Sequence, residues 1–234
     1  MKQWIYQNSS KIVNKLKLLS LELIIVIAAF FSSVFLIIFL IKDVFIEKTG
    51  KIDEPVFKFI SGYTNETNTQ LMQVFTFVGS HYFLIPANLL LVAYTLYIRK
   101  DNWFAIKIAS VAITSLLMMS GLKLLFNRPR PLMPLLQHAA GYSFPSGHTF
   151  MSFTFFGLLI YIVNHMVSNI SIRIIFTLFF LCMILLVGIS RIYLRVHYAT
   201  DVMAGLAIGI VWLVLSLWVL YIIENNKTKL PSIE

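Results

Sequence analysis

The chain has 234 residues, of which 59% are hydrophobic and 12% are charged, and its mean hydropathy is +0.83. Soluble domains carry about 25% charged residues, so this chain has too little polar surface to cover a water-soluble globule. The high apolar content excludes disorder, and the single cysteine, Cys182, excludes a disulfide scaffold. A net charge of +9 indicates a membrane surface, nucleic acid or an anionic substrate as partner, and the positions of the charges must distinguish these.

Stretches with few or no charged residues recur along the chain and are long enough to cross a bilayer. A bilayer core about 30 Å thick requires roughly 20 apolar residues in a helix. We find six such stretches and predict an all-α integral membrane bundle of six transmembrane helices. They cover residues 23–41, 71–98, 103–126, 149–167, 174–190 and 202–223. The first is longer than the core of a secretory signal, so we expect a retained anchor.

The segments outside these stretches are short. Between the first two, residues 52–60 have the pattern of an amphipathic helix, which we expect to lie in the membrane interface. The chain contains no repeat of solenoid period, no low-complexity linker and no separate soluble domain. We therefore predict a single membrane domain over residues 1–234, with an N-terminal cytoplasmic segment (1–20) and a C-terminal cytoplasmic tail (224–234).

Lysine and arginine in short loops predict the orientation, because positively charged loops stay in the cytoplasm. The two terminal segments, the turn with Arg99 and Lys100 together with nearby Lys107, and the turn before Arg173 share one side and hold more than half of the cations. Both termini are therefore expected in the cytoplasm. The external side then holds loops 127–148 and 191–201, whose basic character requires a reason other than topology.

Three polar clusters fall at the ends of predicted helices, all on the expected external face. The clusters are Lys123 with Arg130 and Pro131, Pro145 to His148, and Ser190 to Asp201. In the second cluster Ser146 can cap the following helix, and Gly147 lets a bound group approach the backbone. A helix N-terminus attracts anions, and three nearby cations would suit a phosphate dianion. These cations are Lys123, Arg130 and Arg191.

His197 and Asp201 are four residues apart and would share one face of a helix. A carboxylate on one imidazole nitrogen fixes the tautomer and leaves the other nitrogen free as a nucleophile. His148 is a second imidazole that could protonate a leaving oxygen. An anion cradle, an oriented nucleophile and an acid together indicate phosphoryl transfer through a covalent intermediate.

Simpler interpretations exist for each residue taken alone. A lysine or arginine at a membrane edge usually anchors a helix, and a lone histidine at a helix start is more often a polar cap than a catalyst. A metal site built from His148, His197 and Asp201 is disfavoured, because the neighbouring cations would repel a divalent ion. We expect no metal and no cofactor. The occurrence of all three clusters on one face favours a catalytic site.

The three clusters resemble the pattern of the type 2 phosphatidic acid phosphatase superfamily, which also includes vanadium haloperoxidases. That pattern is Lys-x6-Arg-Pro, then Pro-Ser-Gly-His, then Ser-Arg-x5-His-x3-Asp, and this chain matches it in order over a core of about residues 103–223. The resemblance implies that His197 attacks phosphorus to form phosphohistidine, Asp201 orients it, and His148 protonates the leaving group. It also implies metal-free binding of the phosphate oxygens by Lys123, Arg130, Ser146, Gly147 and Arg191.

Several residues remain ambiguous or unassigned. Arg128-Pro129 is a second Arg-Pro pair, but only Arg130 has the six-residue spacing from the lysine. Arg195 lies inside the variable stretch of the third cluster and is treated as auxiliary. His81 falls inside the second predicted span, where a role in polar packing is expected. Two further histidines receive no assignment, namely His138 and His165.

The six predicted spans disfavour the soluble haloperoxidase branch and favour a substrate whose phosphate lies at the lipid–water boundary. The resemblance suggests undecaprenyl diphosphate, phosphatidylglycerophosphate or phosphatidate as substrate, and the compact six-span architecture resembles bacterial members of the family. The external orientation expected from the lysine and arginine count favours undecaprenyl diphosphate or phosphatidylglycerophosphate, processed at the outer leaflet. An alternative is a lipid phosphotransferase that uses the same intermediate. An anion transporter is a weaker alternative, because the last three spans are almost uncharged at mid-depth. No nucleic acid partner is expected.

Overall fold

The computed structural model describes residues 23–132, 134–135 and 141–227, and within these ranges the regular structure is entirely helical. Six helices are long and apolar enough to cross a membrane, which confirms the predicted all-α bundle. They are Leu23–Glu47, His81–Ile98, Asn102–Phe126, Gly147–Met166, Ile170–Tyr193 and Ala199–Asn226. The predicted cytoplasmic segment 1–20, most of the predicted tail 224–234, and His138 lie outside the described residues.

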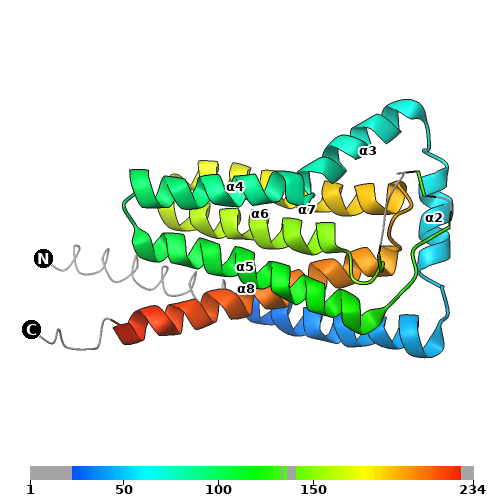
Figure 1. The fold of residues 1–234 in the computed structure, drawn as a ribbon, viewed down its shortest axis with the longest axis horizontal. Coiled ribbons are helices and arrows are strands. Elements are labelled where there is room, and N and C mark those ends of the chain that lie inside the picture. Colours follow the sequence, from blue (N-terminus) through cyan, green and yellow to red (C-terminus); the bar gives the residue numbers. More distant parts are fainter. Residues whose placement is uncertain (1–22, 133, 136–140, 228–234) are drawn as a thin grey trace, which may run out of the picture.

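The helices follow one another with short connections. The first span, Leu23–Glu47, ends in a π-helical turn. After it come α2 (Asp53–Ser61), α3 (Glu66–Val78), α4 (His81–Ala93) with a π-helical extension (Tyr94–Ile98), α5 (Asn102–Phe126), α6 (Gly147–Met166), α7 (Ile170–Tyr193) and α8 (Ala199–Lys227). Figure 1 shows α4 to α8 running side by side along the long axis of the molecule.

The core of the bundle is built around α6, which packs most extensively against α7 and α8. Phe150, Phe156 and Leu158 of α6 are buried among apolar side chains of its neighbours. The outward faces of the helices instead expose large apolar side chains, such as Leu89, Leu117 and Phe179. Apolar residues on both the inner and outer faces are what a helix surrounded by lipid requires.

The predicted second span is wrong at its start, because residues 71–98 form two helices rather than one. The break falls at Gly79 and Ser80. A Cβ atom on Gly79 would lie 2.4 Å from Cγ1 of Val187, so only glycine allows the junction to approach α7 this closely. Ser80 is extended (ψ 158°) and its hydroxyl donates to the carbonyl oxygen of Phe77 at 2.6 Å. The crossing helix therefore begins at His81, and α3 leaves the bundle at an angle (Figure 1).

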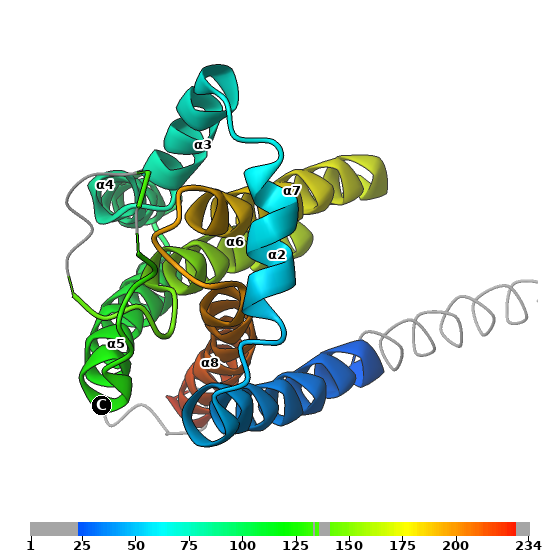
Figure 2. The ribbon, with the colours of Figure 1, turned by 90° about the vertical axis from the view of Figure 1, so that its right-hand side faces the viewer.

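The expected amphipathic helix is present as α2, which lies across one end of the bundle (Figure 2). Its apolar residues pack against the end of α7 and the start of α8, where Ile192, Ala199 and Val202 form a small buried cluster. The packed residues are Val56, Phe57 and Ile60 of α2 and Ile52, which immediately precedes it. The same packing brings the buried side chain of Asp53 to the first turn of α8.

The end of the bundle covered by α2 is also where α5 and α7 end and where α6 and α8 begin (Figure 1). Polar side chains that are at most 3% exposed gather there. They are Ser143, Ser146, Thr149, Ser190, Arg191, His197, Thr200 and Asp201. Burying so many polar groups is unfavourable unless they are hydrogen-bonded, so this end of the molecule is the place to look for a functional site.

Candidate active site

The first sequence cluster lies where α5 gives way to a loop. Asn127 adopts a left-handed conformation (φ 47°) and ends the helix just beyond Lys123. The loop is fastened by Ser143, whose backbone N–H donates to the carbonyl oxygen of Arg128 at 2.8 Å and whose hydroxyl donates to that of Pro129 at 2.9 Å. These bonds fix the backbone between Arg128 and Arg130, so both guanidinium groups extend from a defined position.

The second cluster opens α6, as predicted. Ser146 occupies the N-cap position, but its side chain makes no capping hydrogen bond and instead accepts one from the hydroxyl of Thr149 at 2.9 Å. Its backbone N–H donates to the carbonyl oxygen of Asp201 at 3.0 Å. A Cβ atom on Gly205 would lie 2.8 Å from the carbonyl oxygen of Ser146, so glycine is required for α8 to pack this closely. The N-terminus of α6 is thus held against α8.

Gly147 and His148 form the first turn of α6 and lie next to Lys123. A Cβ atom on Gly147 would lie 3.7 Å from Nζ of Lys123, so the glycine leaves room between the helix amides and the ammonium group. His148 is partly buried, within range of the charges of Arg191, Lys123 and Arg130. The positive end of the helix dipole therefore faces further positive charge, an arrangement that suits an anion.

Arg191, at the end of α7, is only 3% exposed. One of its terminal nitrogens donates to the hydroxyl of Thr76 on α3, whereas its Nε is buried without a hydrogen-bond partner among the described residues. Sequence reasoning missed Thr76, because nothing in the apolar run around it marks this threonine. A buried guanidinium with an unused donor is a good ligand for a phosphate oxygen.

His197 is 1% exposed, and its two ring nitrogens face opposite charges. Nδ1 lies 3.4 Å from Oδ2 of Asp201, and Nε2 lies 3.4 Å from a terminal nitrogen of Arg130. Burial, reinforced by the positive charges of Arg191 and Arg130, lowers the pKa of His197 to about 4, although Asp201 acts in the opposite direction. The imidazole is therefore neutral at pH 7, with its Nε2 lone pair directed toward the cations when Nδ1 carries the proton.

Asp201 is completely buried and has a distinct partner for each oxygen. Oδ2 accepts the backbone N–H of Tyr198 at 2.9 Å in addition to facing His197. Oδ1 accepts a hydrogen bond from Arg128 at 2.5 Å, and the Arg128 guanidinium lies 4.0 Å from the ring centre of Tyr198. Although burial opposes it, the pKa of Arg128 is raised, because Asp201 and Asp53 stabilise its charge. Arg128, left ambiguous by the sequence, is thus a direct partner of Asp201.

Arg130, the second arginine in the loop, donates to two backbone carbonyl oxygens. Its Nε donates to the carbonyl oxygen of Gly141 at 3.0 Å, and a terminal nitrogen donates to that of Val196 at 2.7 Å. Burial lowers the pKa of Arg130, which Asp201 partly offsets. Arg130 remains charged, and it lies beside His197 at the nitrogen not occupied by Asp201.

Two residues considered in the sequence lie away from this site. Arg195 has a left-handed backbone (φ 54°) and lines a different surface hollow, together with Phe57 and Lys58. His165, near the far end of α6, stacks on Tyr161 with ring centres 5.9 Å apart. Neither side chain is among the groups around His197.

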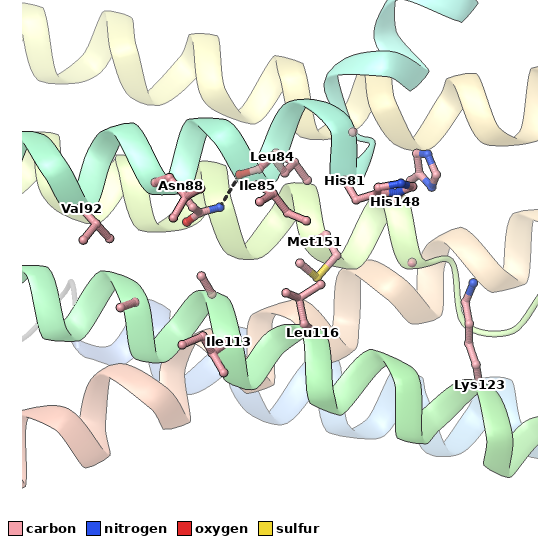
Figure 3. A pocket seen from close by; sticks show the side chains of 15 residues that line it. His81, Leu84, Ile85, Asn88, Val92, Ile113, Leu116, Lys123, His148 and Met151 are labelled. Carbon is pink, nitrogen blue, oxygen red and sulfur yellow. Dashed lines mark hydrogen bonds between the residues drawn. The ribbon is translucent and has the colours of Figure 1, made fainter.

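A cavity of about 370 Å³ runs along α4, α5 and α6. Lys123, Gly147 and His148 line one end, and apolar side chains such as Ile113 and Leu116 line the rest (Figure 3). His81, expected to pack inside a span, is exposed and lies at the polar end beside His148. The cavity can therefore take a molecule with one polar, anionic end and a long apolar part.

Histidine, cysteine and carboxylate groups do not form a metal-binding cluster in the part of the chain that the structure describes: no three of them lie close enough together to hold an ion. Around His197 the groups that could bind a ligand are mostly cationic donors. The donor set therefore fits an anion rather than a cation.

The region that contains the three clusters is similar to known proteins. Residues 103–225 match the family model described as PAP2 superfamily. Phosphatidylglycerophosphatase B of Bacillus subtilis is 31% identical over 142 residues, which cover 60% of this chain and 70% of the relative.

Two crystal structures share the fold. A transmembrane PAP2-type phosphatidylglycerolphosphate phosphatase from Bacillus subtilis matches with a TM-score of 0.74 at 24% identity, over 88% of this chain and 98% of the other. Aquifex aeolicus LpxE matches with a TM-score of 0.52 at 27% identity, over 71% of this chain and 94% of the other. The resemblance inferred from the three clusters is thereby confirmed: the chain belongs to the PAP2 superfamily, as a multi-pass membrane phosphatase.

Proposed function

We propose that this phosphatase removes phosphate from a membrane lipid through a covalent phosphohistidine on His197. One observation carries the proposal. A neutral imidazole, with Asp201 at one nitrogen and Arg130 at the other, lies among buried and half-buried cations, and Lys123 and His148 of the same site line the end of a largely apolar cavity. A lipid phosphate has the same two halves, an anionic head and an apolar tail, so the site complements both.

In the first half of the reaction, Nε2 of His197 attacks phosphorus and forms a nitrogen–phosphorus bond. The bond from phosphorus to the lipid oxygen breaks, and its electron pair goes to that oxygen, which takes a proton from the protonated form of His148 and leaves that imidazole neutral. The negative charge of the bound phosphate offsets the neighbouring cations and so favours the protonated form. Asp201 accepts the Nδ1 hydrogen bond and stabilises the positive charge that develops on the imidazole. His148, at the end of the cavity where a lipid head would lie, is well placed for this proton transfer.

In the second half, water attacks the phosphorus of phosphohistidine and gives a proton to His148. The nitrogen–phosphorus bond breaks, inorganic phosphate leaves, and neutral His197 is restored. We assign the phosphate oxygens to the cationic side chains and to the amides that open α6, without a metal ion. The residues of this cradle are Lys123, Arg130, Ser146, Gly147 and Arg191.

Among the candidate lipids, phosphatidylglycerophosphate is favoured because the curated relative is named phosphatidylglycerophosphatase B. Undecaprenyl diphosphate and phosphatidate have the same chemistry at the cleaved bond and remain alternatives. A phosphotransferase would replace water by an acceptor lipid in the second half of the reaction. Product analysis with and without an acceptor lipid distinguishes the two.

We place the site on the external face and both termini in the cytoplasm, on the basis of the loop cations. Single cysteines in a Cys182→Ser background test this orientation. Ser61→Cys, on the exposed side of α2, should react with an impermeant thiol reagent added to intact cells, whereas Lys100→Cys, in the turn before α5, should react only after lysis. The opposite pattern would place the site in the cytoplasm.

The substrate class is tested by phosphate release from the three lipids in detergent with chelator present, each also in a short-chain, water-soluble form. Ala112→Phe should fill the cavity and raise KM for the long-chain lipid while leaving the short-chain form nearly unaffected. Ala28→Phe, the same change on the exposed face of the first span, is the matched control. An equal loss on both forms, or dependence on added magnesium, would contradict the proposal.

A further inference from the structure

One buried carboxylate at the site lies outside the region that the family model matches. Asp53, in the first turn of α2, is 5% exposed. Its Oδ1 accepts the backbone N–H of Thr200 at 2.9 Å and the Thr200 hydroxyl at 3.0 Å. Its Oδ2 accepts a hydrogen bond from Arg128 at 2.8 Å. Asp53 thus contacts both the loop after α5, 75 positions later in the chain, and the start of α8, 147 positions later.

The contact with Thr200 satisfies a backbone donor that the helix itself cannot. Thr200 is the second residue of α8, so its N–H has no partner in the preceding turn. Asp53 therefore acts as an N-terminal cap supplied by another helix, and its negative charge also matches the positive end of the α8 dipole. Asp201, the next residue along α8, is held in place by the same interaction.

The contact with Arg128 reaches Asp201 by a second route. One terminal nitrogen of Arg128 bonds to Asp53, and the other bonds to Oδ1 of Asp201 at 2.5 Å and to the Thr200 hydroxyl at 2.8 Å. With Oδ1 so occupied, Asp201 presents Oδ2 to His197 and to the backbone of Tyr198. The position of Arg128 thus decides which carboxylate oxygen faces the imidazole.

We infer that Asp53 is a positioning residue for the phosphatase reaction: by holding Arg128 and the first turn of α8, it sets the orientation of Asp201 toward His197. The inference rests on the proposed roles of His197 and Asp201. It also gives α2 a function, because docking of this helix onto the bundle completes the support of the reacting groups. Without the Asp53 charge, Arg128 has Asp201 as its remaining carboxylate partner and can bind both of its oxygens, drawing Oδ2 away from the imidazole.

The test is Asp53→Asn, which keeps the size of the side chain and an oxygen for Thr200 but removes the charge that holds Arg128. We expect kcat to fall about 10- to 100-fold with KM changed little, because the oriented pair is misplaced while the phosphate cradle is intact. Asp53→Glu should restore part of kcat. Glu54→Gln, the same change at the neighbouring exposed position, should leave kcat and KM unchanged.

A double-mutant cycle separates positioning from simple structural support. In an Arg128→Gln background, Asp53→Asn should cause little further loss of kcat, because the main effect of the Asp53 charge is to hold Arg128 and the amide oxygen still accepts from Thr200. Thermal unfolding in detergent checks that each variant is folded. Wild-type kcat in Asp53→Asn, or losses that simply add in the double variant, would overturn the inference. If His197→Ala also retained activity, the proposed function itself would be wrong; if only Asp53→Asn were active, the positioning role alone would fail.

Discussion

Two regions of the chain contribute to the site, and they contribute different kinds of group. Residues 103–225, which match the family model, supply the oriented imidazole, the cations and the amides at the start of α6. The preceding region, from the first span to α4, supplies side chains that hold those groups: Asp53 contacts Arg128 and Thr76 contacts Arg191. A recognisable motif thus contains the proposed reacting groups, whereas two of the contacts that hold those groups come from segments whose sequence carries no motif.

We therefore expect substitutions in residues 103–225 to lower turnover more than substitutions in the preceding region. His197→Ala should lower kcat on the order of 10⁵-fold or more, because no other group replaces the nucleophile. The rate of phosphate release at saturating substrate measures this loss of kcat. His165→Ala changes a histidine that lies away from the site, so this variant is the control and should be fully active. Substantial activity in His197→Ala would place the nucleophile elsewhere.

Asp201→Asn should have the next largest effect, about 10³-fold in kcat. The amide keeps the size of the side chain but neither fixes the imidazole tautomer nor stabilises its positive charge, so KM should change less than kcat. Steady-state kinetics and a check of folding by thermal unfolding are sufficient. Unchanged turnover would show that the contact between His197 and Asp201 at 3.4 Å has no role in catalysis.

Thr76→Val tests the preceding region. The substitution keeps the shape of the side chain but removes the acceptor for a buried terminal nitrogen of Arg191, so the guanidinium loses a fixed partner. We expect KM to rise about tenfold with kcat less affected, because binding of the phosphate oxygens is weakened. Thr67→Val, at an exposed position of the same helix, is the matched control. Equal behaviour of the two variants would show that α3 does not support the cradle.

The smallest expected effect is on the pH dependence of kcat/KM. Because the pKa of His197 is lowered to about 4, the imidazole of the free enzyme is neutral above that value and becomes protonated, and inactive, as pH falls through it. At pH 5 about nine-tenths of the enzyme should still have neutral His197, whereas an ordinary imidazole would be almost fully protonated. The measurement is kcat/KM against pH, corrected for the separately determined ionisation of the substrate. A remaining acidic limb near pH 6.5 would contradict the buried, cation-flanked environment.

Much of this architecture could be predicted from the sequence, for physical reasons. An uncharged run long enough to span a bilayer has few alternatives to a transmembrane helix, so all six spans could be located. The three clusters could be placed together because each lies at the end of a span on one side. The expectation that His197 and Asp201 share one helix face is wrong, because His197 lies in the turn before α8, but their four-residue spacing still brings Nδ1 of His197 within 3.4 Å of Oδ2 of Asp201.

The rest depends on contacts between distant segments. The break at Gly79 follows from close approach to Val187, which no local pattern reveals inside an apolar run. Asp53 and Thr76 are single polar residues whose partners lie 75 and 115 positions away, so their roles depend on how the helices pack. The sequence did carry one signal, because the Arg-Pro pair occurs twice in succession and so places a second arginine near the site. It did not reveal the role of Arg128.

Covalent transfer of phosphate to His197 is tested most directly by trapping the phosphoenzyme. The enzyme is mixed with a ³²P-labelled phosphate ester of a good leaving group, which needs little help from an acid, and quenched within its first turnover in alkali, where phosphohistidine survives. We predict a radiolabel that is stable in alkali, is lost in acid and maps to the peptide containing His197, and that is absent from His197→Ala. A label on another residue, or phosphate release at full rate with no labelled protein at any quench time, would contradict the phosphohistidine pathway.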